Sequence, residues 1–138
     1  MAYAGFDLTG KVAVVIGGTS GIGRAIARGL AEAGADVVAS SRRAEQVEET
    51  AKEIEGLGKR TVRVTSDVCD GASLEKLLVA SVREFGKVDI LVNSAGTTKR
   101  GATADYSEED WNKILETNLT GTLRSCQIFG KHMIDITL

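Results

Sequence analysis

The sequence predicts an α/β fold built on a doubly wound parallel sheet, and two patterns support this prediction. Short runs of β-branched and other apolar residues alternate along the chain with longer segments whose apolar residues follow a helical period. Parallel neighbours in a sheet need a crossover connection, and a helix of this length supplies one. The sequence contains no linker-like stretch, so we expect one domain over residues 1–138.

Four segments are expected to be strands. The first, residues 12–16, reads Val-Ala-Val-Val-Ile, which is typical of a strand buried on both faces. The three strands expected after it are residues 37–39, 61–65 and 88–92. Because a glycine turn or a helical segment separates each strand from the next, the sheet is expected to be parallel throughout.

Helical periodicity is found between and after these strands. The expected helices cover residues 21–33, 44–57 and 73–85, and a last one begins after Ser107 and continues toward His132. The first places Ile22, Ile26 and Leu30 on one apolar stripe. Ser107 precedes three acidic residues and is suited to cap the last helix, which we expect to bend near Gly121.

The composition excludes several classes of function. The chain is 43% hydrophobic and 26% charged, which suits a domain with a buried core. The formal net charge of −2 lacks the basic excess of a nucleic-acid-binding or membrane-surface protein. No apolar run approaches the roughly 18 residues of a spanning helix, and no leader pattern is evident, so we expect a cytoplasmic protein.

Single residues outside these patterns have ordinary structural interpretations. Cys69 and Cys126 are far apart, and one histidine accompanies them, so neither a zinc site nor a disulfide is favoured. We expect both cysteines to be small core residues and His132 to be solvated at a helix end. Trp111 is expected in the core because it has helical spacing with Ile114.

A glycine-rich turn joins the first expected strand to the first helix. Its glycines are spaced GxxxGxG at Gly17, Gly21 and Gly23. A dinucleotide site needs one glycine at the turn, one where backbone N–H groups approach a pyrophosphate, and one where the helix packs closely. An ordinary tight turn is the alternative in a chain with 16 glycines, but the strand-to-helix context favours a dinucleotide. Cofactor contacts are also expected at Thr19, Ser20 and Ile22.

The residues after the second strand indicate which dinucleotide is bound. A carboxylate there would bond the ribose hydroxyls of NAD, whereas an arginine pairs with the 2′-phosphate of NADP. The sequence has Ser41 and Arg42, followed by Arg43, while Asp36 lies at the opposite end of the strand. We therefore predict NADP (NADPH), with Ser41 and Arg42 at the phosphate. The alternative is a solvated pair of arginines.

The glycine spacing and three later segments resemble the short-chain dehydrogenase/reductase family, whose fold is a Rossmann-type sheet. The family turn reads T-G-x-x-x-G-x-G, and Ile16 replaces its threonine. Asp67 and Val68 are similar to the family's adenine-contacting pair. Residues 93–96 (Asn-Ser-Ala-Gly) are similar to its N-N-A-G segment, with Ser94 in place of one asparagine. This resemblance implies cofactor contacts at Asp67, Val68, Asn93, Ala95 and Gly96.

The resemblance also implies one catalytic residue, Asn118, which matches the family asparagine that helps to hold a proton-relay water. Each of these polar residues has a structural alternative. Asp67 could cap a turn, and Asn93 and Asn118 could be amides that bond exposed backbone. Their shared position at the carboxyl edge of one sheet favours the functional interpretation, because ligands of open α/β sheets bind there.

The family's catalytic tyrosine and lysine have no counterpart here. They are spaced Tyr-x-x-x-Lys, whereas Tyr3 and Tyr106 are each followed at that spacing by aspartate. The resemblance continues to about Met133 and then stops. We therefore expect a dinucleotide-binding domain whose sheet is truncated after about four strands, corresponding to the N-terminal part of the family fold.

Two functions remain open from the sequence. The first is an NADP(H)-dependent oxidoreductase that moves hydride between nicotinamide and an alcohol or carbonyl substrate. The second is a non-catalytic NADP-binding or protein-interaction module. In either case the resemblance implies a homo-oligomer packed through the last helix, with no nucleic-acid or membrane partner.

Overall fold

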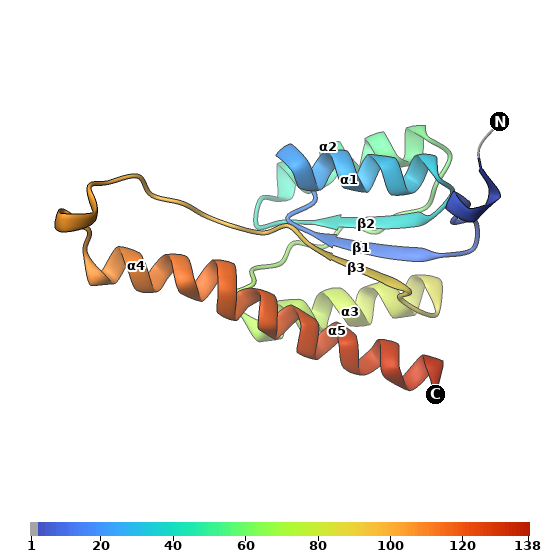
Figure 1. The fold of residues 1–138 in the computed structure, drawn as a ribbon. Helices are drawn as coiled ribbons and strands as arrows, with labels where there is room; N and C mark the ends of the chain where they lie inside the picture. The colour runs from blue at the N-terminus through green and yellow to red at the C-terminus, as the bar shows by residue number, and fades with distance from the viewer. Residues whose placement is uncertain (1–2) are drawn as a thin grey trace.

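The computed structural model describes residues 3–138, and in it a parallel sheet lies between two layers of helices (Figure 1). The sheet consists of β1 (Val12–Ile16), β2 (Asp36–Ser40) and β3 (Ile90–Asn93), in the order β2-β1-β3. Both pairings are parallel, and Ala13 lies opposite Val37 on one side and Ile90 on the other. The predicted α/β class is confirmed, and all the strands end at one edge.

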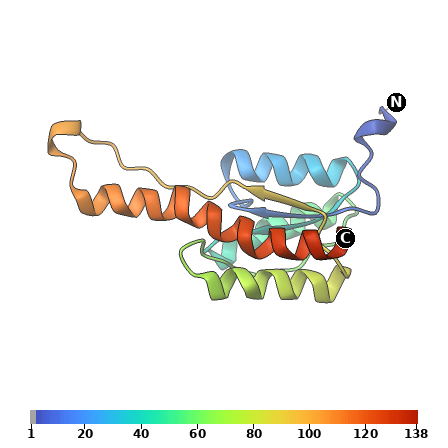
Figure 2. The same cartoon turned by 60° about the horizontal axis from the view of Figure 1, so that its bottom comes forward.

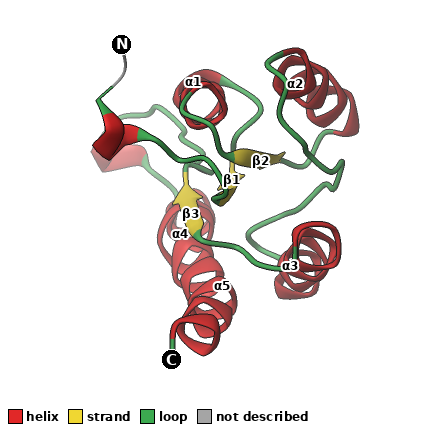
Figure 3. Cartoon of the chain, turned by 90° about the vertical axis from the view of Figure 1, so that its right-hand side faces the viewer, coloured by secondary structure: helices red, strands yellow, loops and turns green. Residues whose placement is uncertain are grey.

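Helices cover both faces of this sheet, as Figure 3 shows. One face carries α1 (Gly21–Glu32) and α2 (Ala44–Gly56), and the other carries α3 (Gly71–Phe85) and α5 (Gly121–Thr137). None of the helices in residues 3–138 combines the length and apolar character that crossing a bilayer requires.

A long segment extends beyond the carboxyl edge of the sheet before the chain returns. Figures 1 and 2 show the loop after β3 leaving the body of the molecule and α4 (Glu108–Leu115) leading back. Short 3-10 turns occupy Ala4–Phe6 and Thr103–Asp105. The side chain of Ser107 accepts a hydrogen bond from the Asp110 N–H, as the sequence predicted. A π-helical turn, Glu116–Thr120, joins α4 to α5 and accounts for the irregularity expected near Gly121.

The first helix presents a different face to the sheet from the one that the sequence suggested. Gly23, Ala27 and Ala31 are buried and Leu30 packs against the core, whereas Ile22 is 78% exposed and Ile26 36%, so the expected stripe is wrong at the two isoleucines. A β-carbon on Gly23 would lie 1.9 Å from the carbonyl oxygen of Gly17. Because the helix approaches the backbone this closely, small residues rather than large apolar ones form its buried face.

Residues 61–65 run beside β2 but do not form the expected strand. The Val37 N–H donates to the Arg60 carbonyl (3.2 Å) and the Ser66 N–H donates to the Ser41 carbonyl (3.0 Å), and both bonds fit a single parallel register. Between them, the Ser40 hydroxyl donates to the Val64 carbonyl at 2.6 Å. In that register the Val64 carbonyl would accept from the Ser41 N–H, so a side chain replaces a ladder bond.

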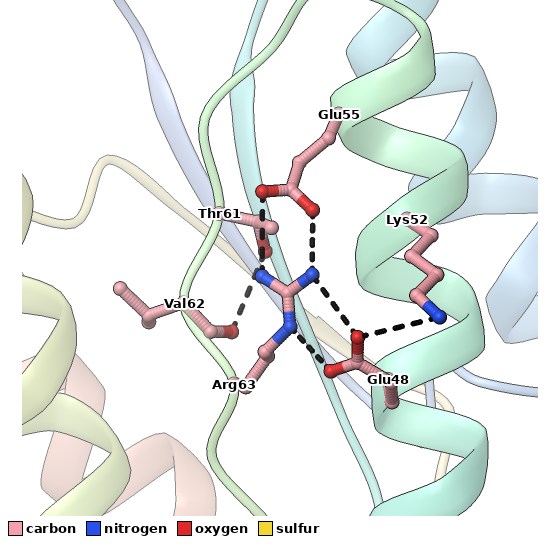
Figure 4. A network of polar contacts seen from close by, with 6 residues as sticks. All are labelled: Glu48, Lys52, Glu55, Thr61, Val62 and Arg63. Carbon is pink, nitrogen blue, oxygen red and sulfur yellow. Dashed lines mark hydrogen bonds and ion pairs between the residues drawn. The ribbon is translucent and has the colours of Figure 1, made fainter.

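Besides the hydrogen bonding to β2, ion pairs attach residues 61–65 to α2. Arg63 bonds the carboxylates of Glu48 and Glu55, both on α2, and Lys52 adds a weaker contact to Glu48 (Figure 4). The hydrogen bonds from Arg63 hold the pKa values of Glu48 and Glu55 below their ordinary values. Side chains therefore supply part of the attachment that a backbone ladder supplies in the other strands.

Several single-residue expectations are also wrong. Trp111 is 58% exposed, and Cys69 and Cys126 are exposed rather than part of the core. His132 is not merely solvated, because its Nε2 accepts a hydrogen bond from the Val88 N–H at 3.1 Å. The buried aromatic residue of the last helix is Phe129, which packs with the side chains of α3 and the sheet.

The contrast between the two aromatic residues predicts opposite effects of substitution. Phe129→Ala should lower the free energy of unfolding by about 3–5 kcal/mol, because it removes a fully buried ring and leaves a cavity. Trp111→Ala should change it by no more than about 0.5 kcal/mol, as exposed substitutions do. Urea unfolding of both variants measures the difference. Equal losses would contradict the placement of α4 and α5.

Candidate functional site

A cavity of about 730 Å³ opens at the carboxyl edge of the sheet. Its walls come from the turn after β1, the end of β2, residues 66–69, the segment after β3, and the π-helical turn. Most of the residues predicted from the sequence line it: Gly17, Ser20, Ile22, Gly23, Ser41, Arg42, Asp67, Val68, Ala95 and Gly96. Chain segments far apart in sequence thus meet at the edge where parallel strands end.

The glycines of the turn after β1 differ in their surroundings and backbone conformation. Gly17 has φ +78°, and a β-carbon there would lie 2.4 Å from the Ala95 nitrogen. Gly21 has φ +51°, with no atom within 4 Å of its β-carbon position. Ser20 forms no side-chain cap on α1, so the first-turn N–H groups can face an anion. The turn can therefore receive a phosphate on its open side while its other side packs against backbone.

The end of β2 supplies hydroxyl groups and cations. Thr19 is 2% exposed, and its hydroxyl bonds Ser41 Oγ at 2.6 Å and Gln46 Oε1 at 3.3 Å. Thr19 thus positions Ser41 from behind instead of lining the cavity. Arg42 and Arg43 line the cavity and are exposed, and neither forms an ion pair within residues 3–138.

Residues 66–69 form a compact turn beside β2. The Asp67 carboxylate accepts a hydrogen bond from the Cys69 N–H at 2.9 Å, so it does cap a turn, as the structural alternative held. It also lines the cavity. Val68 is 6% exposed, and its carbonyl accepts a hydrogen bond from Arg124 on α5. This part of the wall is therefore fixed on both sides.

The two asparagines are exposed, and each bonds a neighbouring group. Asn118 Oδ1 accepts from the Thr97 N–H (2.7 Å) and its Nδ2 donates to the Thr97 carbonyl (2.8 Å). Asn93 Nδ2 donates to Cys126 Sγ at 3.4 Å. The structure brings neither side chain to the lining of the cavity, whereas Thr97 itself lines it. Asn118 therefore fixes the backbone that follows Gly96.

The sequence did not single out several lining residues, among them Gln46, Lys113, Glu116 and Thr117. Lys113 precedes Glu116 and Thr117 by one helical turn, so the three side chains share one helix face. Glu116 and Thr117 directly precede Asn118 in the sequence, and this position is the signal that would have indicated all three residues. A smaller cavity of about 240 Å³ adjoins this wall, between Lys99 and Asp110. Their ion pair lowers the pKa of Asp110, helped by the hydrogen bond from Ser107.

The donor set fits an elongated anionic ligand. Open N–H groups and glycines face one part of the cavity, and two arginines without ion pairs face another. No cluster of three His, Cys, Asp or Glu side chains occurs in the described part of the chain. This arrangement suits the phosphates of a dinucleotide.

Comparisons with known proteins agree with this geometry. A family model described as short chain dehydrogenase matches residues 11–137. The chain is 42% identical over 130 residues to D-threitol dehydrogenase of Mycolicibacterium smegmatis, covering 94% of this chain and 50% of that protein. It is 40% identical over 131 residues to the NADP-dependent mannitol dehydrogenase of Alternaria alternata, covering 92% and 49% respectively.

A solved structure gives the same result. The short-chain type dehydrogenase/reductase from Mycobacterium marinum superposes with a TM-score of 0.92 at 34% identity, covering 96% of this chain and 54% of that one. The chain spans about half the length of the relatives it matches. The turn after β1, the parallel sheet and these matches together show that the chain belongs to the short-chain dehydrogenase/reductase family.

Proposed function

We propose that residues 1–138 form the NADP(H)-binding domain of an oxidoreductase that transfers hydride between nicotinamide and a small alcohol or carbonyl substrate. The observation that carries the choice of NADP is the pair Arg42 and Arg43, which line the cavity without carboxylate partners in the described residues. The competing carboxylate, Asp36, bonds Arg60 at the other end of β2. Asp36 therefore does not stand at the carboxyl end of β2, where a carboxylate would select for free ribose hydroxyls.

Each wall of the cavity has a role in this proposal. The N–H groups at the start of α1 would receive the diphosphate, and Ser41 with Arg42 would bond the 2′-phosphate. Asp67 and Val68 would contact the adenine. Ala95 and Gly96 would border the rest of the cofactor, on backbone that Asn118 keeps in place. Bound NADPH would supply the hydride.

A non-catalytic NADP-binding or interaction module is the second candidate. The sequence observation behind it is that the 138 residues contain no Tyr-x-x-x-Lys pair. Both candidates share the cofactor site, and measured turnover separates them. Cytoplasmic location remains a prediction from sequence.

Self-association is part of the proposal and has a structural basis. Trp111, Leu115, Leu119 and Leu123 are 36–65% exposed along α4, the π-helical turn and α5. Apolar side chains grouped on one helical rod favour contact with a second copy.

The cofactor preference can be tested by charge reversal. The chain should bind NADPH more tightly than NADH by about 1–3 kcal/mol in calorimetric titrations, because only NADPH offers Arg42 a charge-assisted partner. Arg42→Asp should reverse this order. Arg100→Asp is the matched control, since Arg100 is also exposed but lies outside the cavity lining. Equal affinities of the wild-type chain for the two cofactors would refute the proposal for NADP.

The glycine turn can be tested at Gly21, where a β-carbon meets no other atom of the protein. Gly21→Ala should leave the far-UV circular dichroism spectrum unchanged and weaken NADPH binding at least about tenfold, because the methyl group and the strained φ disturb the approach of phosphate. Gly29→Ala, in open space on the same helix, should bind normally. Full NADPH affinity of a folded Gly21→Ala variant would show that the turn is only structural.

The activity and association of the 138-residue chain form the third test. We expect no NADPH oxidation with a panel of carbonyl compounds, and light scattering should report self-association that Leu119→Lys reduces. NADPH should raise the melting temperature through ligand linkage. Turnover that Asn118→Ala abolishes would show that another residue of this chain supplies the proton, and a strictly monomeric chain would remove the proposed self-association.

A further inference from the structure

We infer that Arg124 is a positioning residue that couples the adenine end of the cavity to the π-helical turn Glu116–Thr120. The inference rests on the proposed function, because it assigns a role to a residue behind the proposed cofactor site. Arg124 does not line the cavity itself. Its side chain is 28% exposed, and it bonds groups that belong to two different walls.

The first bond holds the part of the cavity wall formed by Asp67 and Val68, which would contact the adenine. Arg124 Nη1 donates to the Val68 carbonyl at 2.6 Å, across 56 residues of sequence. A guanidinium that bonds a backbone carbonyl in a partly buried place makes a stronger hydrogen bond than a neutral donor does. Because Val68 lines the cavity, this bond helps to set where the wall stands.

The second bond fixes the turn. Arg124 Nη2 donates to Glu116 Oε1 at 2.5 Å, and Glu116 begins the π-helical turn and lines the cavity. Two residues further on, Asn118 holds the backbone of Thr97 through both atoms of its amide. The planar guanidinium therefore stands between Val68 and a turn that itself restrains the segment after β3.

The packing around Arg124 brings the two walls into direct contact. A β-carbon on Gly121 would lie 2.7 Å from Val68 Cγ2, so the start of α5 is in close contact with Val68. Cys69 Sγ also lies 3.5 Å from Thr117 Oγ1. With little free space between the loop and the turn, a ligand that displaces or orders Val68 acts on Glu116 through Arg124.

Binding of the adenine end alone tests this coupling. The probe is adenosine 2′,5′-bisphosphate, which carries no nicotinamide, and hydrogen exchange is followed in the full 138-residue chain. In the wild type the probe should slow exchange at residues 67–70 and also at residues 116–121. In Arg124→Met it should slow exchange only at 67–70, and the affinity for the probe should fall on the order of tenfold.

Further variants separate positioning from general stability. Arg124→Lys, which keeps the charge but cannot span both partners, should recover part of the affinity. Glu116→Ala leaves the bond to Val68 and should abolish the response at 116–121 with a smaller loss of affinity. It therefore decides the question if Arg124→Met does not fold. Arg28→Met is the matched control, because Arg28 bonds Glu32 and Glu53 away from the cavity and should behave as the wild type.

The outcomes distinguish this inference from the proposed function. If the wild-type chain binds neither NADPH nor the bisphosphate, the proposed function fails and the coupling fails with it. If the wild type binds both, and Arg124→Met or Glu116→Ala retains the response at 116–121, the cofactor site stands and the role of Arg124 is overturned.

Discussion

The backbone of the turn after β1 lies directly against the backbone that leaves β3, and the cavity depends on this contact. A β-carbon on Gly17 would approach the Ala95 nitrogen to 2.4 Å, so no other residue type fits there without moving one of the two segments. A β-carbon on Gly23 would lie still closer to its neighbour, the carbonyl oxygen of Gly17, from the side of α1. The contact brings together the helix start and the segment after β3, and both become walls of one site.

Cations without an ion-pair partner are concentrated at the lining of that cavity. Arg42 and Arg43 line the cavity at the end of β2 and form no ion pair in the described chain, and the same holds for Lys113 at another part of the lining, whereas Arg63 and Lys99 outside the lining are paired with Glu48, Glu55 and Asp110. A cation that already has a carboxylate partner gains less from a phosphate than one whose partner is water. The cations most able to recognise a phosphate group are thus Arg42 and Arg43 beside Ser41, together with Lys113.

Elements whose buried residues follow the expected period could be predicted from the sequence. The prediction failed where small residues instead of large apolar ones pack on the sheet, and where a side-chain hydrogen bond replaces one of the backbone ladder. β1 was evident because all its residues are buried and apolar. The buried face of α1 was missed because glycine and alanine, rather than Ile22, pack on the sheet. Residues 61–65 have strand-like composition, but the hydroxyl of Ser40 takes a carbonyl that the ladder would need.

The site could be predicted from sequence to the level of chain segments, because parallel strands end at one edge and the motifs follow strand ends. The direction of each side chain could not. Thr19 and Asn118 are turned to bond Ser41 and Thr97, and periodicity contains no information on such long-range polar contacts. Glu116 was missed because its place in the lining depends on how the π-helical turn approaches residues 66–69, which the sequence pattern does not show.

That turn has a consequence for the geometry of the whole rod formed by α4 and α5. A π turn holds one more residue than an α turn, and each residue of a helix advances the side-chain direction by about 100°. The five residues Glu116–Thr120 therefore rotate the side chains of α5 about the helix axis relative to those of α4, compared with an uninterrupted α-helix. Lys113 can face the cavity on one side of the turn while Phe129 faces the sheet on the other. Removing a single residue from the turn would rotate α5 relative to α4 by about 100°. Lys113 could then not face the cavity while Phe129 faces the sheet.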